Sequence, residues 1–243
     1  MKANLYEYLA GNEYPGRGIC IGKTPSGKKA MIAYFIMGRS VNSRNRVFDP
    51  IAGGIRTMAA DPSKMTDSHL IIYNPVLTFD KTTIVTNGDQ TDTIRDFIAR
   101  NDFPGFSFEA ALNTRTFEDD SPNWTPRISG VVDMCLGGYK LSILKSDDGD
   151  EKSVQRFTFD YPHPLAGEGH FISTYKCNGT PIPSFAGEPL RVAMDEEDPG
   201  KYAGKLWEAL NEDNKVSLFV RAIDLATQAY KDVIINKYKT GEE

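Results

Sequence analysis

Short apolar segments bounded by turn residues run through the first third of the chain and predict β-strands. Residues 18–24 and 29–39 flank the turn sequence TPSGKK and predict a β-hairpin. Residues 69–79 and 82–88 predict two further strands, and the second of these ends at the turn dipeptide Asn87-Gly88. We therefore expect antiparallel sheet in this part of the chain.

Other segments are expected to be helical, at residues 4–11, 91–102, 106–115, 201–213 and 216–239. Gly11 is expected to end the first of these helices, and Thr91 to cap the amino terminus of the second. Apolar residues recur every three or four positions through the last segment. This spacing predicts an amphipathic helix docked on a core.

The middle of the chain is expected to be rich in β-structure. Alternating apolar residues predict strands at 127–146, 154–161 and 168–176, with loops through the proline-rich residues 160–200. No internal repeat or linker divides the chain of 243 residues. We therefore expect one compact α+β domain over residues 1–243.

Composition narrows the classes of protein that need to be considered. A net charge of −5 gives no overall attraction to nucleic acid or anionic membrane. The longest apolar run, residues 30–37, is far shorter than the ~20 residues that cross a bilayer. Three widely spaced cysteines and the absence of a signal-peptide pattern favour a cytoplasmic protein without disulfides.

Cofactor chemistry has no support in the motifs. The chain has no P-loop, no dinucleotide-binding glycine motif and no HExxH sequence. The three histidines also lack the spacing of metal ligands on a helix. We therefore expect a protein that needs neither a metal ion nor a cofactor.

Residues 39–46, RSVNSRNR, carry three guanidinium groups, two carboxamides and two hydroxyls directly after a predicted strand. Arginine forks match phosphate oxygens with paired hydrogen bonds, and asparagine and serine add neutral donors. This arginine cluster therefore predicts an anion site at the end of the strand. A solvated loop or an intramolecular salt-bridge hub explains the same residues without a ligand.

Three further segments carry residues suited to catalysis or binding. Tyr73, followed by Asn74, is either a proton donor or a core tyrosine. Residues 86–93, TNGDQTDT, are suited to an anion at a helix start, and a simple helix cap explains them as well. Glu118 is either a general base or one charge of a solvated acidic loop.

Five motifs in the same order and spacing resemble the monofunctional IMP cyclohydrolases of archaea and their bacterial relatives. They are YPGRGICIG, GRSVNSRNRVF, IIYNP, VTNGDQTDTI and WTPRISG, which together span residues 14–130. The resemblance implies the four-layer αββα sandwich of the N-terminal nucleophile hydrolases. The chain begins Met1-Lys2, so we expect the fold without its amino-terminal nucleophile and Cys20 as a buried strand residue.

The resemblance also implies a reaction that needs no cofactor. The carboxamide nitrogen of 5-formamidoimidazole-4-carboxamide ribotide attacks the formyl carbon of the same molecule, and water leaves to give IMP. The implied catalytic residues are Tyr73, Glu118 and either Arg46 or Arg44. Tyr73 is expected to donate a proton to the formyl oxygen and Glu118 to act as base for the carboxamide, although these two roles are exchangeable.

Substrate contacts are implied in the same way. Arg39 is expected to hold the 5′-phosphate, with Arg17 and Arg127 as further candidates. The remaining contacts to the purine ribotide are expected from Ser40, Asn45, Asn74, Asn87, Gly88, Thr91, Asp92 and Thr93. Regions outside the motifs are expected to shape the pocket or a homo-oligomer interface.

This chain departs from the shorter archaeal pattern in two loops. The arginine cluster is longer than the compact form RSxxNR, and NWTPR carries one extra residue. Two other functions therefore remain open. One is a nucleotide- or phosphosugar-binding protein without cyclisation activity, and the other is an amidohydrolase of similar fold, which the missing amino-terminal nucleophile disfavours.

Overall fold

The computed structural model describes residues 2–64, 72–100 and 105–239. Its helices are α1 (Leu5–Ala10), α2 (Val41–Arg44), α3 (Gln90–Arg100), α4 (Ser107–Asn113) and α5 (Pro199–Ala209), with a 3₁₀ turn at Pro62–Lys64. Its strands are β1 (Arg17–Lys23), β2 (Lys29–Met37), β3 (Val47–Ile51), β4 (Gly54–Met58), β5 (Val76–Phe79), β6 (Thr82–Thr86), β7 (Arg127–Asp133), β8 (Tyr139–Asp147), β9 (Asp150–Tyr161), β10 (Glu168–Ser173), β11 (Leu190–Ala193), β12 (Lys215–Asp224) and β13 (Tyr230–Asn236).

The strands form two antiparallel sheets, so the expected α+β class is confirmed. Within the described residues, sheet A has the order β11-β10-β1-β2-β12-β13, and sheet B has the order β3-β4-β5-β6-β7-β8-β9. In sheet B and in the β1–β2 hairpin, strands that are consecutive in the chain are also neighbours in the sheet. β10 and β12 then return from the second half of the chain to flank this hairpin in sheet A.

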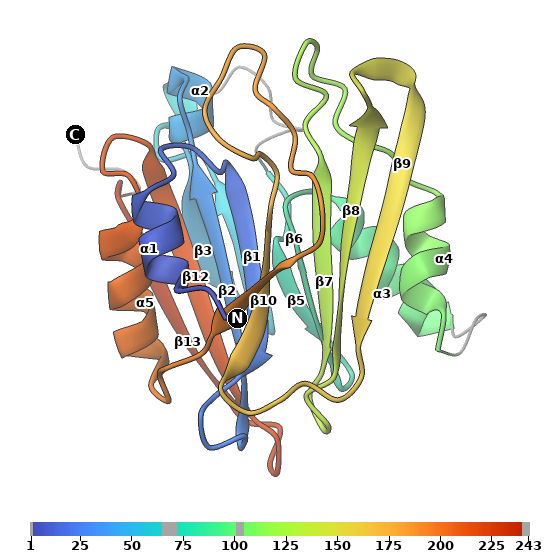
Figure 1. Ribbon diagram of the computed structural model, residues 1–243, viewed down its shortest axis with the longest axis vertical. Coiled ribbons are helices and arrows are strands. Elements are labelled where there is room, and N and C mark those ends of the chain that lie inside the picture. The colour runs from blue at the N-terminus through green and yellow to red at the C-terminus, as the bar shows by residue number, and fades with distance from the viewer. Residues whose placement is uncertain (1, 65–71, 101–104, 240–243) are drawn as a thin grey trace.

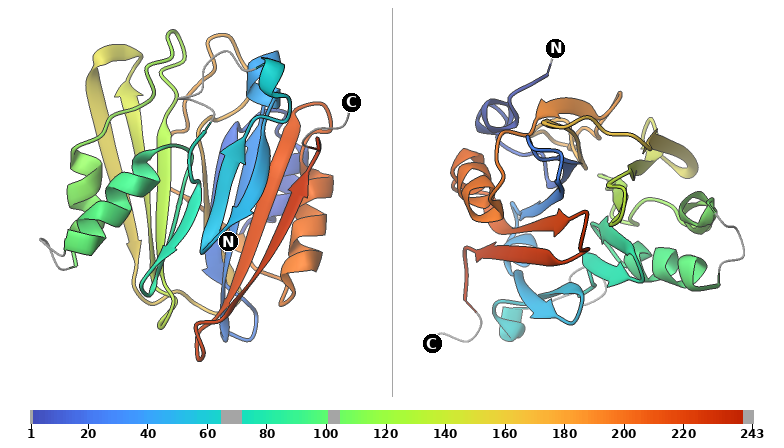
Figure 2. Two further views of the ribbon diagram at one scale, coloured as in Figure 1. Left: turned by 180° about the vertical axis from the view of Figure 1, so that it is seen from behind. Right: turned by 90° about the horizontal axis from the view of Figure 1, so that it is seen from below.

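Three apolar clusters stack the elements into four layers (Figure 1). One cluster fills the space between the sheets, a second packs α1 and α5 on the outer face of sheet A, and a third packs α3 and α4 on sheet B. Figure 2 shows the same arrangement along the strands, with helices outside both sheets. Each sheet therefore has apolar side chains on both faces, which explains the continuous apolar runs in the sequence.

The β1–β2 hairpin is the best-predicted part of the fold. Its strands pair from Arg17↔Ile36 to Lys23↔Ala30, as the apolar segments and the turn TPSGKK indicate. In β2, alternate residues face different layers, so that Ile32, Tyr34 and Ile36 lie between the sheets. Cys20 is buried in β1, as expected.

The prediction of an amphipathic helix at 216–239 is wrong, because this segment forms β12 and β13. β12 is buried on both faces: Leu218 and Val220 contact the helix layer, and Phe219 lies between the sheets. A strand buried on both faces gives an unbroken apolar run, which periodicity alone does not distinguish from a helix. Asp224 supplies the turn, since its carboxylate accepts hydrogen bonds from the backbone of Ala226 and Thr227.

Smaller corrections concern element boundaries. The strand expected at 69–79 begins only at Val76, and its residues 69–71 lie outside the described residues. Thr91 is not the helix cap, because α3 already begins at Gln90. β3, β4 and β11 were not predicted, and neither was the short helix α2 inside the arginine cluster, which Ser40 caps.

Antiparallel pairing brings one end of many strands to the same end of the sandwich. β2 and β6 finish at this end, and β1, β3 and β7 begin there, near α2 at the top of Figure 1. We call it the α2 end. No helix among the described residues is long and apolar enough to cross a membrane.

Candidate active site

An ion pair joins two residues of the α2 end that lie far apart in the chain. The guanidinium of Arg17, at the start of β1, donates a 2.7 Å hydrogen bond to the Glu118 carboxylate. Burial opposes the charge on Arg17, but Glu118 and the neighbouring tyrosines together outweigh it and hold the pKa of Arg17 well above its usual range. Glu118 is only 8% exposed and faces the permanent positive charge of Arg17.

Asn87 holds the same carboxylate from the other side. Its side-chain amide donates to Glu118 at 3.3 Å and to the Pro126 carbonyl at 2.9 Å. Its side-chain oxygen accepts from the backbone of Ile128 and from Gln90. All four hydrogen-bonding positions of Asn87 are therefore used inside the protein, and they fix the end of β6 against the loop that carries Glu118.

Two tyrosines meet beside this ion pair. The hydroxyls of Tyr34 and Tyr73 lie 2.9 Å apart, and both residues are buried. Burial and the neighbouring Tyr73 raise the pKa of Tyr34 well above its usual range, against the positive charges of Arg17 and Arg46. The two phenols and the two guanidinium groups thus form one electrostatically coupled group at the α2 end.

The three guanidinium groups of the arginine cluster contact different parts of the protein. Arg46 lies at the start of β3 and is 4% exposed, and its Nε donates to the Ser43 carbonyl at 3.0 Å. Arg44 turns back to the Gly38 carbonyl and to Asn214. Arg39 lies over the Tyr14 ring, at 5.0 Å from its centroid, and binds Asn178 and the Gly179 carbonyl. Of the three, Arg46 is the one that acts on the Tyr34 hydroxyl.

None of these three arginines has a carboxylate within ion-pair distance among the residues that the structure describes. Most other arginines do have one, as in the pairs Arg56–Asp49, Arg191–Glu168 and Arg221–Asp232. The salt-bridge hub considered for residues 39–46 is therefore wrong. A buried guanidinium without a carboxylate is suited to an anion or a polar group that comes from outside.

Several of the predicted binding residues are occupied by structural contacts. Arg127 donates to Asp89 at 2.8 Å and to Gln90 at 2.7 Å. The Thr91 hydroxyl bonds to Thr86 and to the Gly88 carbonyl. Asp92 pairs with Arg95 on its own helix, and Thr93 is half-buried beside it. Within the described parts of the chain, none of these residues bonds directly to the Arg17–Glu118 pair, and Arg127 is connected to Glu118 only through Gln90 and Asn87.

The other predicted contacts have similar local roles. The Ser40 side chain caps α2, and Asn45 exchanges two hydrogen bonds with the backbone of Asp61. Asn74 is half-buried next to Tyr73. A Cβ atom on Gly88 would lie 2.4 Å from Nη1 of Arg127, so glycine allows this arginine to approach the turn.

Neither Tyr34 nor a second network behind Glu118 was predicted from the sequence. The Thr125 hydroxyl lies 2.5 Å from both the Asp120 carboxylate and the Tyr175 hydroxyl. Burial raises the pKa of Asp120, and it raises the pKa of Tyr175 to about 12. Tyr175 in turn stacks on Tyr14, beneath Arg39. This network fixes the loop that presents Glu118.

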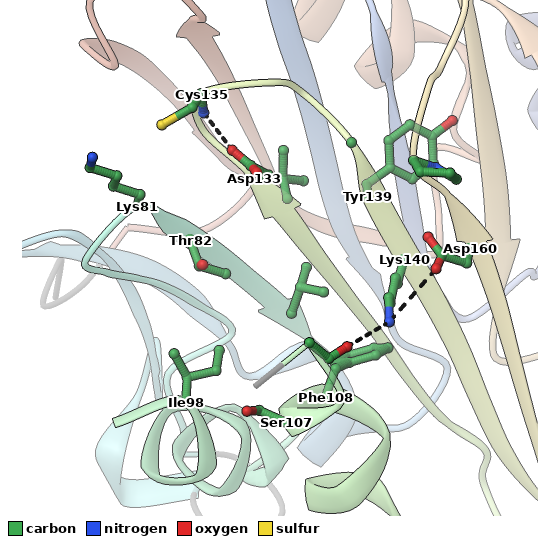
Figure 3. Close-up of a pocket in the computed structure, with 15 residues that line it drawn as sticks. Lys81, Thr82, Ile98, Ser107, Phe108, Asp133, Cys135, Tyr139, Lys140 and Asp160 are labelled. Carbon is green, nitrogen blue, oxygen red and sulfur yellow. Dashed lines mark hydrogen bonds and ion pairs between the residues drawn. The ribbon is translucent and has the colours of Figure 1, made fainter. Parts of the chain in front are cut away.

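A cavity of about 440 Å³ lies away from these residues, between the outer face of sheet B and the helices α3 and α4 (Figure 3). Its polar groups bind one another: Lys140 contacts Glu109 and Asp160, and Asp133 accepts a hydrogen bond from the Cys135 backbone. It shares no lining residue with the predicted site. No group of His, Cys, Asp and Glu side chains in the described residues is arranged to hold a metal ion.

Comparison with known proteins shows the family of this chain. The family model of the IMP cyclohydrolase-like proteins matches residues 14–228. An IMP cyclohydrolase of Methanococcus aeolicus is 28% identical over 76% of this chain and 83% of its own length. Those of Methanopyrus kandleri and Methanococcus maripaludis are 27% and 29% identical, over 76% of this chain and 84% and 89% of their own lengths. The chain belongs to the IMP cyclohydrolase-like protein family.

Proposed function

We propose that this protein closes the second ring of the purine, converting 5-formamidoimidazole-4-carboxamide ribotide into IMP and water. One observation carries this proposal within the family: a buried carboxylate, a buried phenol pair and the unpaired guanidinium of Arg46 converge at the α2 end. These are a base, a proton donor and a positive charge, which the reaction needs. A protein that only binds nucleotides has no need of the first two.

The chemistry begins with a substrate whose reacting groups are already joined. Holding the carboxamide nitrogen against the formyl carbon supplies much of the acceleration, because no second molecule has to be brought in. Glu118 accepts a proton from the carboxamide nitrogen as the carbon–nitrogen bond forms. Tyr73 donates its proton to the formyl oxygen, which becomes a hydroxyl on the new ring. Protonated Glu118 then gives its proton to this hydroxyl, which leaves as water, while the former formamido nitrogen returns its proton to the Tyr73 oxygen.

The surroundings of each group support this division of roles. Arg17 holds the Glu118 carboxylate in place through a buried ion pair, as a positioned base requires. The phenol pair is buried near two positive charges, so Tyr73 is suited to donate its proton to an oxygen that gains negative charge. Arg46 stabilises the same developing oxyanion. Its position favours Arg46 over Arg44 in this role.

Arg39 is proposed to hold the 5′-phosphate, because its only contacts among the described residues are neutral groups. Arg127 is not part of this proposal, since its guanidinium is already held by Asp89, which it shares with Arg115, and by Gln90. Asn87 is proposed to position Glu118 rather than to bind the base. Asn74, next to Tyr73 at the same end, remains a proposed substrate contact.

Three wider features complete the proposal. The layer order supports a sandwich of the N-terminal nucleophile hydrolase type, with Cys20 buried rather than serving as a nucleophile. The cluster of buried residues shared by both sheets supports a single domain. Three free cysteines fit a cytoplasmic location. A homo-oligomer remains a prediction.

The test is turnover by purified protein in the presence of a chelator and without ATP. The formylated ribotide is supplied, and the appearance of IMP is followed by absorbance. Glu118→Gln is expected to lower kcat by about a hundredfold, because a general base contributes roughly that much. Its affinity for IMP is expected to stay close to that of the wild type. Binding of IMP without any turnover by the wild type would instead favour a nucleotide-binding protein.

A further inference from the structure

Tyr34 occupies the central strand of sheet A and has no surface exposure, yet it carries a polar hydroxyl into the core between the sheets. Its ring stacks on Phe48, with 5.6 Å between ring centroids, and its backbone pairs with β1 and β12. The ring is therefore held from several sides. A buried hydroxyl is costly unless it has a hydrogen-bond partner.

The Tyr73 hydroxyl is the only partner of the Tyr34 hydroxyl among the described residues. Each phenol has one hydrogen, so one of the two donates and the other accepts. If Tyr73 donated, the hydrogen of Tyr34 would be buried without an acceptor, at a cost of roughly 1–3 kcal/mol. Donation from Tyr34 to Tyr73 places the unpartnered hydrogen on Tyr73 instead, which is 6% exposed, whereas Tyr34 is 0% exposed.

We propose that Tyr34 is a positioning residue that donates its hydrogen bond to Tyr73 and so directs the Tyr73 proton to the substrate oxygen. This inference rests on the proposed function, in which Tyr73 is the proton donor. Tyr34 does not touch the substrate. It fixes the direction of the Tyr73 hydroxyl and stabilises the negative charge that Tyr73 acquires as its proton leaves.

The charged and titratable groups around the pair are consistent with this direction. Arg17 reaches it from β1 and Arg46 from the start of β3, and both are positive. Tyr34 itself stays protonated, because burial raises its pKa well above the usual range. Tyr34 is thus a permanent donor, and Tyr73 is the member of the pair that gives up its proton.

The kinetic test compares two single variants and their combination. Tyr34→Phe removes one oxygen and is expected to lower kcat by about tenfold, which corresponds to one lost hydrogen bond, with KM within about twofold of wild type. Tyr73→Phe is expected to lower kcat by about a hundredfold or more. Tyr34→Phe is expected to add nothing further in the Tyr73→Phe background, because it acts only through Tyr73.

The matched control is Tyr202→Phe, which removes another buried phenol. The Tyr202 hydroxyl contacts Cys20 and Met194 in the layer between sheet A and α5, away from the site. Its kcat is expected to equal that of the wild type. Wild-type kcat in Tyr34→Phe, or losses from Tyr34→Phe and Tyr73→Phe that simply add, would overturn the proposal.

A second measurement is independent of turnover. The ¹⁹F resonance of 3-fluorotyrosine incorporated at position 73 reports the ionisation of that phenol directly. In the Tyr34→Phe background its titration midpoint is expected to move to higher pH by about one unit, because the anion has lost a donor. An unchanged midpoint overturns the role of Tyr34 even if the wild type is inactive, whereas inactivity of the wild type counts only against the proposed function.

Discussion

Two buried arginines near opposite ends of the inter-sheet core are neutralised in different ways. Arg221, in β12, is 0% exposed and binds the Asp232 carboxylate with two hydrogen bonds of 2.7 Å. It also donates to Thr78 of the facing sheet and lies 3.7 Å from the centre of the Tyr230 ring. Arg46, at the α2 end, is nearly as buried and has no carboxylate among the described residues.

The difference separates a structural arginine from one that we propose to be functional. The charge of Arg221 is neutralised within the folded protein by the Asp232 carboxylate. Its hydrogen bonds to the Gly53 carbonyl and to Thr78 also join β12 to sheet B. Arg46 keeps a charge that the fold itself does not neutralise. Keeping such a charge buried costs stability, and the cost is offset when a ligand supplies the missing negative charge.

The largest expected effect concerns Arg46. Arg46→Gln is expected to lower kcat/KM by about a thousandfold, because it removes the charge that stabilises the oxyanion. The free energy of unfolding of the ligand-free protein is expected to stay the same or to rise, since an unpaired buried charge is lost. Steady-state kinetics and urea unfolding measure the two effects separately.

Arg44→Gln is the matched control, because Arg44 comes from the same cluster and binds only neutral groups. Its turnover is expected to stay within severalfold of wild type. A greater loss in Arg44→Gln than in Arg46→Gln would exchange the roles of the two residues.

The next largest effect is expected on stability rather than on turnover. Arg221→Met is expected to lower the free energy of unfolding by about 3 kcal/mol, because it leaves Asp232 without its partner in a partly buried place. Turnover per folded molecule is expected to stay unchanged. The double variant Arg221→Met/Asp232→Leu is expected to recover part of the stability. A loss of turnover in Arg221→Met under folding conditions would contradict the purely structural role.

The smallest effect is expected at Arg127. Arg127→Gln removes hydrogen bonds to Asp89 and Gln90 and is expected to cost about 1 kcal/mol of unfolding free energy. KM for the ribotide is expected to change by less than about threefold, because Asp89 and Gln90 already hold the Arg127 guanidinium. A tenfold rise in KM would indicate that Arg127 binds the 5′-phosphate. It would contradict the division between paired structural arginines and unpaired binding arginines.

Local sequence signals predicted the elements that are specified locally. The β1–β2 hairpin has both its apolar segments and its turn residues in one stretch, and the density of donors marked the arginine cluster. β12 was misread because its apolar run reflects burial between two layers, which is a property of the whole fold.

The site was predicted in part for the same reason. Arg17 and Glu118 were both named from sequence, but their pairing links residues about a hundred positions apart and depends on how the sheets stack. Tyr34 was not predicted as a site residue because it lies inside the apolar run of β2, where the sequence does not distinguish it from an ordinary core residue. Its hydrogen bond to Tyr73, which lies in the segment before β5, is what distinguishes it.

The β1–β2 hairpin supplies both Arg17 and Tyr34, and Ile19 and Tyr34 are paired across it. Because side chains alternate along a strand, one residue inserted between Ala30 and Tyr34 would turn the phenol from the inter-sheet space to the helix layer. One residue added to the turn TPSGKK would leave that orientation intact. Natural variation in chain length is therefore expected to be confined to the turn, and a length change within β2 would mark a relative that has lost this arrangement.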